Sequence, residues 1–188
     1  PEHWFMTNAV STIKLHDKLR KFKFLEKYVH ISTPEVYGSC GGYIKEGVHY
    51  EPSTPYAVSR AAADMSLHSF HKAYQFPVVF TRAANVYGPG QQLYRIIPRT
   101  ILYIKLGKKL PLHGGGLSER SFIHIQDVSE ATMSICRKAP AGEIYHIATK
   151  NSITIIDLVR MICDLLGVAF EDHVEVVGER LGKDTAYL

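Results

Sequence analysis

Apolar positions along the chain occur at helical spacing in some segments and in short continuous runs in others, the pattern of a mixed α/β protein. Helical spacing over residues 4–22 predicts an amphipathic helix. An apolar run predicts a buried strand over 28–33, and an alanine-rich segment predicts a helix over 55–74 with Pro55 in its first turn. A second run predicts a strand over 78–81. Strand, helix and strand in this order indicate a βαβ unit, and hence a parallel sheet.

The second half of the chain gives shorter predicted elements. They are helices over 96–106, 128–137 and 155–167, and strands over 110–113, 120–125 and 143–147. Gly114-Gly115-Gly116 predicts a flexible turn, and Gly167 predicts the end of the last helix. Because the sequence starts within the approach to a helix and stops without a terminating signal, we expect both ends to be cut from a longer protein.

Composition narrows the class of protein. The chain has 188 residues, 46% apolar and 21% charged, and 22 Lys+Arg against 18 Asp+Glu give a net charge of +4, which fits a soluble globular protein. We expect a cytoplasmic location and no membrane partner, because no apolar window reaches the length of a membrane span and no secretory signal is present. The three cysteines, odd in number and far apart, predict neither a disulfide framework nor a metal site.

A run of basic residues over 14–27 raises the question of nucleic-acid binding. Asp17 and Glu26 interrupt the run, and no aromatic ladder is interleaved with it. A solvated helix face explains such a run equally well, so we expect no nucleic-acid partner.

Candidate chemistry lies in the segment Tyr56-Ala57-Val58-Ser59-Arg60. Tyr56 and Arg60, four residues apart, share one helix face. A nearby positive charge favours the phenolate, so the spacing predicts that Arg60 lowers the pKa of Tyr56 toward the working pH. Such a tyrosine can accept a proton from a substrate hydroxyl while hydride leaves the same carbon. A surface Tyr/Arg pair is the alternative, and the surrounding segments decide between the two.

Two flanking segments lie at the carboxyl ends of predicted parallel strands, where open α/β sheets bind ligands. They read Ser32-Thr33-Pro34-Glu35-Val36-Tyr37-Gly38 and Arg82-Ala83-Ala84-Asn85-Val86-Tyr87-Gly88-Pro89. Further motifs are SFIHIQDV at 121–128, GEIYHI at 142–147 and RLGKD at 180–184. On these motifs, over essentially its whole length, the chain resembles the extended short-chain dehydrogenase/reductase family. Within that family it resembles the NAD-dependent nucleotide-sugar epimerases and dehydratases, most closely the dTDP-glucose 4,6-dehydratases.

The resemblance implies a Rossmann-like doubly wound parallel sheet with a smaller C-terminal α/β substrate lobe, and NAD as the cofactor. Residues 1–89 would form the C-terminal half of the dinucleotide-binding domain. Residues 90–188 would form mostly the substrate lobe, with segments near 119–147 returning to the first domain. None of the 14 glycines falls in G-x-G-x-x-G or G-x-x-G-x-x-G spacing, so we expect the phosphate-binding turn in an N-terminal portion upstream of Pro1.

The resemblance also assigns residues to roles. The catalytic candidates are Tyr56, Thr33, Glu35 and Arg60, with Tyr56 as the catalytic tyrosine, Thr33 as a hydrogen-bond partner of the sugar and Glu35 as the base that removes the proton from sugar C5. The cofactor-binding candidates are Tyr56, Arg60, Ser32 and Ala83. The substrate-binding candidates are Asn85, Arg95, Arg120, Asn151 and Arg180. Turn caps would equally explain Asn85 and Asn151, an exposed strand position would explain Arg120, and a solvated loop would explain Glu35.

The implied activity is a 4,6-dehydration: oxidation at C4, removal of the C5 proton, loss of water and return of hydride to C6. Two positions depart from the family pattern. Arg60 replaces a lysine, and the two side chains are not interchangeable. Pro34 replaces an aspartate that serves the family as an acid, and proline has no proton to donate. A 4-epimerase or decarboxylase of the same family, and a non-catalytic sugar-nucleotide-binding homologue, therefore remain alternatives.

The implied partners are a nucleotide-diphosphate sugar and a second copy of the chain. Members of the family pair through helices that correspond to residues 7–22 and 55–74, which pack as a four-helix bundle. A face buried within one chain is the alternative explanation of the apolar residues in these helices.

Overall fold

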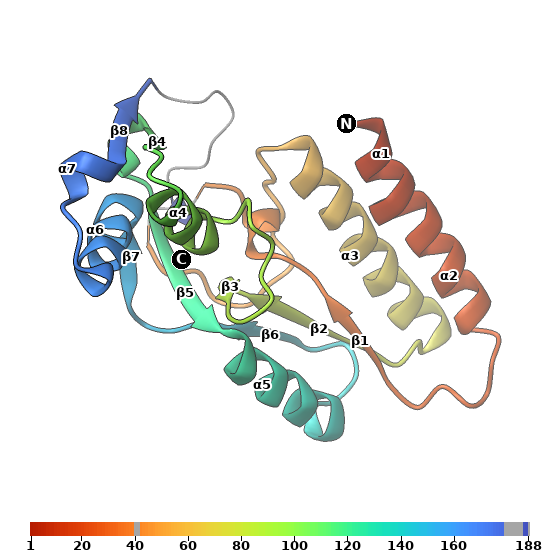
Figure 1. The fold of residues 1–188 in the computed structure, drawn as a ribbon. Helices are drawn as coiled ribbons and strands as arrows, with labels where there is room; N and C mark the ends of the chain where they lie inside the picture. Colours follow the sequence, from red (N-terminus) through yellow and green to blue (C-terminus); the bar gives the residue numbers. More distant parts are fainter. Residues whose placement is uncertain (40–41, 179–185, 188) are drawn as a thin grey trace.

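Three parallel strands form the central sheet of the computed structural model, which describes residues 1–39, 42–178 and 186–187 (Figure 1). They are β1 (Tyr28–Ile31), β2 (Val78–Ala83) and β6 (Ile144–Ile147), in the order β1-β2-β6. Helix α3 (Pro55–Tyr74) connects β1 to β2, so the predicted βαβ unit is confirmed.

Helices cover both faces of this sheet. Helix α3 lies on one face, and α5 (Ile125–Lys138) packs against β1 and β2 on the other (Figure 1). Buried Leu67, Phe76 and Phe80 form the core under α3. Helix α5 begins three residues before its predicted start, because the side chain of His124 accepts a hydrogen bond from the backbone of Gln126 at 3.3 Å.

The chain opens with one continuous helical stretch that packs along α3. It consists of α1 (Glu2–Trp4), a π-helical segment η1 (Phe5–Ser11) and α2 (Thr12–Leu19). The sequence predicts one regular helix over 4–22, and the structure differs in the π-helical turn and in ending at Leu19. Asn8 Nδ2 donates to Ser59 Oγ at 3.0 Å, which ties the π-helical segment to the first turns of α3.

Residues next to each end of α3 explain where this helix begins and ends. The Thr54 side chain accepts a hydrogen bond from the backbone of Ala57 at 3.1 Å, and Pro55 occupies the first helical position, where no N–H is needed. At the other end Gln75 adopts a left-handed conformation, and Pro77 follows two residues later. The predicted bounds of this helix are confirmed.

The second part of the chain contains two smaller sheets and three helices. The strands are β3 (Asn85–Tyr87), β4 (Leu110–His113), β5 (Glu119–His124), β7 (Ser152–Thr154), β8 (Val174–Val177) and β9 (Ala186–Tyr187), and the helices are α4 (Ile96–Lys105), α6 (Ile155–Leu166) and α7 (Phe170–His173). Strand β5 pairs with β3, β7 and β9, and β4 pairs with β8 in parallel. Strands β3, β7 and β8 and helix α7, of three or four residues each, were not predicted.

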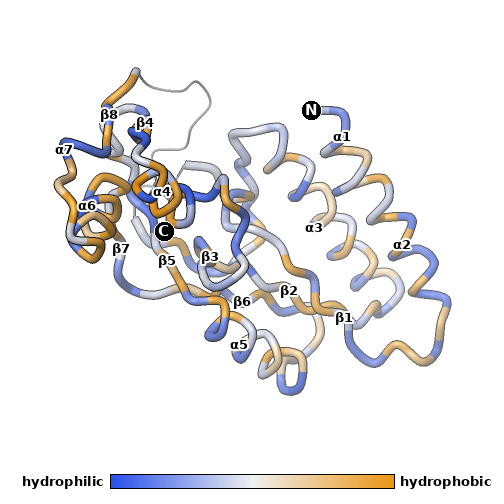
Figure 2. The backbone as a smooth tube through the Cα atoms, viewed as in Figure 1, coloured by the Kyte–Doolittle hydropathy of each residue, from blue (hydrophilic) through white to orange (hydrophobic). Residues whose placement is uncertain are grey.

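A separate apolar core holds this second part together. Leu110, Leu112, Val159 and Ile162 pack there, and Figure 2 shows the hydrophobic stretches of α4 and α6 that surround it. Helix α6 ends at the predicted Gly167, which is left-handed with φ 68°. The predicted turn at 114–116 is a short 3-10 segment, η3 (Gly114–Gly116). In the described part of the chain, no helix is long and apolar enough to cross a membrane.

Two alanine substitutions in α6 test this packing. Ile162 is 7% exposed and Leu165 is 80% exposed. We expect Ile162→Ala to lower the free energy of unfolding by about 2–5 kcal/mol, because it leaves a cavity in the core. Leu165→Ala removes a side chain of the same size from the same helix, and we expect a change below about 0.5 kcal/mol. Urea unfolding measures both values, and equal losses would contradict the described orientation of α6.

Candidate functional site

A cavity of about 920 Å³ opens at the carboxyl ends of β1 and β2. Its walls come from the residues that follow these strands, from the start of α3, from α4 and from β4. Eight of the predicted site residues line it: Ser32, Thr33, Glu35, Tyr56, Ala83, Asn85, Arg95 and Arg120. This position is the one at which open α/β sheets bind ligands.

Glu35 reaches the cavity from a 3-10 turn, η2 (Pro34–Tyr37), directly after β1. Thr33 Oγ1 accepts a hydrogen bond from the Glu35 backbone at 3.3 Å, and Pro34 fits the first position of the turn. Gly38 ends the turn with φ 75°, and a Cβ there would lie 2.1 Å from the carbonyl oxygen of Glu51. The backbone that follows Glu35 therefore requires glycine.

Tyr56 is the second residue of α3 and is half-buried against the N-terminal helix. Its ring meets that of Trp4 edge-on at 6.1 Å between centroids. Its backbone carbonyl accepts a hydrogen bond from Ser59 Oγ at 2.7 Å, and Asn8 binds the same hydroxyl. The Tyr56 ring thus lines the cavity where α3 packs against the N-terminal helical stretch.

The expected direction of the Tyr56 pKa is wrong. Burial raises the pKa of Tyr56 above its ordinary value of 10.0, and the charge of Glu35 raises it further. Arg60 lowers the pKa as its spacing predicts, and Arg95 adds to that effect, but the two cations do not outweigh burial. The phenol is therefore protonated at neutral pH in the described chain.

Arg60 lies one helical turn beyond Tyr56 and is not among the residues that line the cavity. Its Nη2 donates a hydrogen bond to the carbonyl oxygen of Ile31, the last residue of β1. Its Nε is buried and has no hydrogen-bond partner among the described residues. A buried guanidinium N–H in this position is available to an acceptor on a bound molecule.

The predicted substrate residues differ in position: some line the cavity, one is exposed outside it, and one lies outside the described residues. Arg120, only 8% exposed, lines the cavity from β5, so an exposed strand position does not explain it. Asn85 Nδ2 donates to the Ser121 carbonyl at 3.1 Å and joins β3 to β5 at the cavity wall. Asn151 is exposed and outside the lining, and Arg180 lies outside the described residues.

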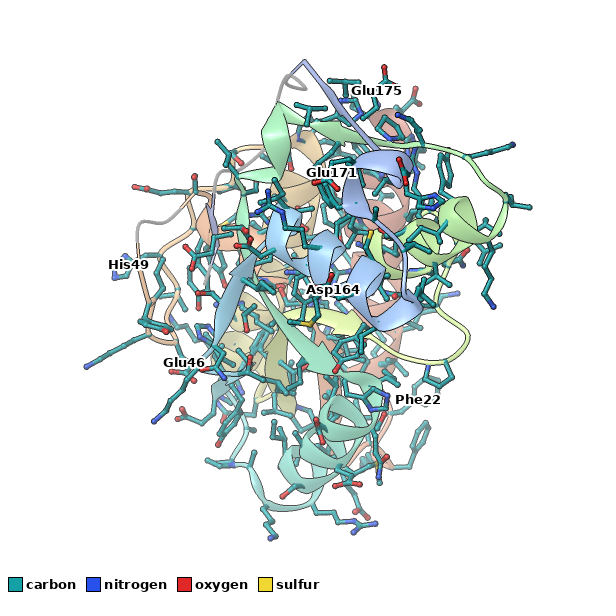
Figure 3. All side chains as sticks on the ribbon, turned by 60° about the vertical axis from the view of Figure 1, so that its left-hand side comes forward. Phe22, Glu46, His49, Asp164, Glu171 and Glu175 are labelled. Carbon is teal, nitrogen blue, oxygen red and sulfur yellow. The ribbon has the colours of Figure 1, made fainter. Side chains whose placement is uncertain are left out.

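The charged side chains that line the cavity are mostly cationic. Arg95, Arg99 and Arg120 line it, and Glu35 is the one carboxylate among the described lining residues. Other acidic side chains of the second part of the chain, such as Asp164 and Glu171, lie on α6 and α7 outside the cavity (Figure 3). The cavity is therefore suited to an anionic ligand that also contacts a carboxylate.

Sequence reasoning missed several residues of this region. Arg99 and His113 line the cavity, and a buried pair, Asp64 and Arg82, lies behind it. A charged residue within an apolar strand and another within an alanine-rich helix are departures from pattern that could have found the pair. Among the described residues no group of three or more His, Cys, Asp or Glu side chains is arranged to hold a metal ion.

Comparisons with known proteins show which family this chain is similar to. The family model described as "NAD dependent epimerase/dehydratase family" matches residues 1–148. The dTDP-D-glucose 4,6-dehydratase of Homo sapiens is 36% identical over 169 residues, which are 87% of this chain and 48% of that protein. The chain thus spans about half the length of this curated relative.

Two solved structures illustrate the similarity of fold. The dTDP-glucose 4,6-dehydratase of Bacillus anthracis in complex with NAD is 38% identical, with a TM-score of 0.91 over 97% of this chain and 58% of that one. The UDP-glucuronic acid 4-epimerase of Bacillus cereus, in complex with UDP-glucuronic acid and NAD, is 28% identical with a TM-score of 0.88, over 95% of this chain and 57% of that one.

Substitutions of opposite charge test the electrostatics around Tyr56. Glu35→Gln removes a charge that raises the pKa of Tyr56, so we expect that pKa to fall. Arg60→Met removes a charge that lowers it, so we expect the pKa to rise. Tyrosinate absorbance during alkaline titration, taken as the difference between each protein and its Tyr56→Phe counterpart, measures the shifts. Glu46→Gln, outside the cavity, is the matched control, and shifts of one sign for both site variants would refute the assignment.

Proposed function

The chain belongs to the NAD-dependent epimerase/dehydratase family, and we propose that it carries the reaction centre of a nucleotide-sugar 4,6-dehydratase of the dTDP-glucose type. One observation carries the proposal: a single cavity brings Tyr56, Thr33 and Glu35 together at the strand ends and continues to Arg95 and Arg120. A proton acceptor, a C5 base and phosphate-binding groups are what this reaction requires of the protein.

The proposal includes the arrangement of domains. Residues 1–89 would belong to a Rossmann-like, doubly wound dinucleotide-binding domain, and residues 90–188 mostly to a substrate lobe, with segments near 119–147 in the first domain. The parallel order β1-β2-β6, with α5 packed on β1 and β2, supports the return of the later segments to the first sheet. A cytoplasmic location stays a prediction.

The residues around β1 fit the nicotinamide end of NAD. Ser32 and Ala83 line the cavity at the ends of β1 and β2. Arg60 has a buried Nε without a hydrogen-bond partner among the described residues. Ribose hydroxyls are acceptors for such a donor. When bound, NAD takes a hydride from the sugar and returns it later in the reaction. The glycine-rich turn that would hold the pyrophosphate is not present in this sequence.

Tyr56 would accept the proton of the C4 hydroxyl as a phenolate. The described surroundings raise its pKa, so binding must tip the balance toward the cations Arg60 and Arg95. Thr33 would hold the sugar through its hydroxyl, whose oxygen already accepts the Glu35 N–H and whose proton remains to be donated.

Glu35 would remove the proton from C5, which the C4 ketone makes acidic. The C6 hydroxyl then leaves and takes up a proton to form water. The hydrogen that left C4 as hydride ends on C6, and C5 is protonated again, so the net change is the loss of one water. Pro34 donates no proton, so water or another group must supply the one that the departing hydroxyl takes.

The phosphates of the substrate would be held by arginines of the cavity. Arg95 and Arg120 line it, and a guanidinium binds phosphate oxygens in pairs. Asn85 would contact the sugar from the cavity wall. Asn151 and Arg180 remain proposed substrate contacts on the resemblance alone.

A 4-epimerase or decarboxylase is the second candidate, and Pro34 is the observation that favours it. These reactions also begin with oxidation at C4 through Tyr56, but they need no acid for a departing C6 hydroxyl. A homologue that binds sugar nucleotides without turning them over is the third candidate, because Arg60 stands where the family has lysine.

We further propose that two copies pair through α3 and the N-terminal helical stretch. Apolar side chains are exposed on both: Met6 is 48%, Val10 is 37% and Met65 is 52% exposed. Helices α2 and α3 lie side by side (Figure 1), so a second copy would complete a four-helix bundle.

The product of the full-length protein tests the function. With NAD and dTDP-glucose we expect a 4-keto-6-deoxy sugar, identified by NMR. Tyr56→Phe should lower kcat by about 10²–10⁴-fold, because it removes the proton acceptor. Tyr74→Phe, in the last turn of the same helix, is the matched control and should leave kcat unchanged. A galactose epimer as product would replace the dehydratase by the epimerase, and tight NAD binding without any product would support the non-catalytic homologue.

Substitutions that introduce a positive charge test the proposed pairing of two copies. Met65→Lys places an uncompensated charge in the proposed seam, and we expect it to convert a dimer to a monomer in sedimentation velocity. Met133→Lys makes the same change on α5, where the side chain is 50% exposed, and should leave the dimer intact. Dissociation by both variants, or by neither, would count against this interface.

A further inference from the structure

We propose that the buried ion pair of Asp64 and Arg82 is a positioning element of the cavity, which fixes both ends of residues 32–37 and thereby the place of Glu35. The inference rests on the proposed function of Glu35 but concerns residues outside the cavity. Neither Asp64 nor Arg82 is among its lining residues, so neither is placed to touch a ligand.

The ion pair joins α3 to β2 in the interior. Arg82 Nη2 lies 2.9 Å from Asp64 Oδ2, and both side chains are 0% exposed. Burial raises the pKa of Asp64, but the hydrogen bond from His30 and the charge of Arg82 outweigh it and hold the pKa below its usual range. Burial likewise opposes the charge of Arg82, and Asp64 more than restores it. Both groups are therefore charged at neutral pH.

Asp64 holds the first end of the segment. Ser32 Oγ donates to Asp64 Oδ2 at 2.7 Å, and His30 Nε2 lies 3.0 Å from Asp64 Oδ1. The Ser32 backbone also donates to the Thr81 carbonyl at 2.8 Å, which continues the pairing of β1 with β2. The residue directly before Thr33 is thus fixed through both its side chain and its backbone.

Arg82 holds the second end. Its Nη1 donates hydrogen bonds to the Tyr37 hydroxyl and, at 2.8 Å, to the Gly47 carbonyl, while Nη2 donates to the Tyr50 hydroxyl at 3.1 Å. The guanidinium also lies over the Tyr37 ring, 4.7 Å from its centroid. His146 Nε2 lies 2.9 Å from the same Tyr37 hydroxyl, so this end is tied to β6 as well.

Glu35 lies between these two anchors. Backbone hydrogen bonds of the turn include those from Val36 to the Thr33 carbonyl at 3.4 Å and from Gly38 to the Glu35 carbonyl at 3.0 Å. The hydrogen bonds of Ser32 and Tyr37 fix its two flanks against α3 and β2. A buried ion pair often adds no more stability than apolar residues would, so we assign this one a role in the geometry of Glu35.

Two tyrosine variants of the full-length protein separate positioning from stability. Tyr37→Phe and Tyr50→Phe each remove one hydroxyl from the same guanidinium, but only Tyr37 belongs to the turn that carries Glu35. We expect Tyr37→Phe to speed amide hydrogen exchange in residues 35–38. We also expect it to lower kcat about tenfold to a hundredfold with little change in KM, because small misplacements of a reacting group have effects of this size. Tyr50→Phe should leave all three quantities near wild type.

Isotope effects locate the affected step. With substrate deuterated at C5, Tyr37→Phe should increase the isotope effect on kcat, because proton transfer to a misplaced Glu35 becomes slower. With substrate deuterated at C4, the effect should not increase. Ser32→Ala loosens the first anchor and leaves the ion pair intact, and it should give the same pattern if Tyr37→Phe does not fold.

The proposal is overturned if Tyr37→Phe and Tyr50→Phe change amide hydrogen exchange in residues 35–38 equally, or if neither Tyr37→Phe nor Ser32→Ala changes it. Exchange does not depend on turnover. If the wild-type protein forms no product, the proposed function fails, while the exchange comparison still decides whether the ion pair fixes this segment.

Discussion

The buried contact between Asp64 and Arg82 is the constraint on which the rest of the site depends. It joins the middle of α3 to the end of β2, and its hydrogen bonds extend to β1 and to the turn after it. Removing one member of such a pair costs about 3–5 kcal/mol, because the other charge is left buried alone. Through these contacts the pair connects α3 and β2 to both flanks of the turn that carries Glu35, which lines the cavity.

Burial and charge act against each other at the reaction centre. The same enclosure that gives Tyr56 a defined place raises its pKa, and the nearby Glu35 adds to the effect. Arg60 and Arg95 act in the opposite direction, and they are the groups that make a phenolate attainable. In the proposed reaction Tyr56 must lose its proton before it can accept the one from the C4 hydroxyl, and the two arginines favour that loss.

The sequence alone predicted the parts of the fold that depend on local signals. The helix from Pro55 is one of them, because its alanine-rich composition, a proline in its first turn and the proline that follows it are local signals. Strands such as β3 and β7 escaped prediction because three residues become a strand only through their partners. The pKa of Tyr56 had the wrong predicted sign because spacing along a helix reports the neighbouring charge and not the burial. Most of the site residues that the family resemblance assigned line the cavity, whereas the distant contacts of Asp64 and Arg82 depend on tertiary structure.

The fate of one hydrogen atom tests the central claim most directly. The full-length protein, supplied with NAD and dTDP-glucose deuterated only at C4, should give a 4-keto-6-deoxy sugar in which the deuterium lies on C6. This result requires oxidation at C4, elimination of water and return of the same hydride to C6. Deuterium that stays on C4 in an epimerised product, or that is absent from C6 of a 4-keto-6-deoxy product, would contradict the account.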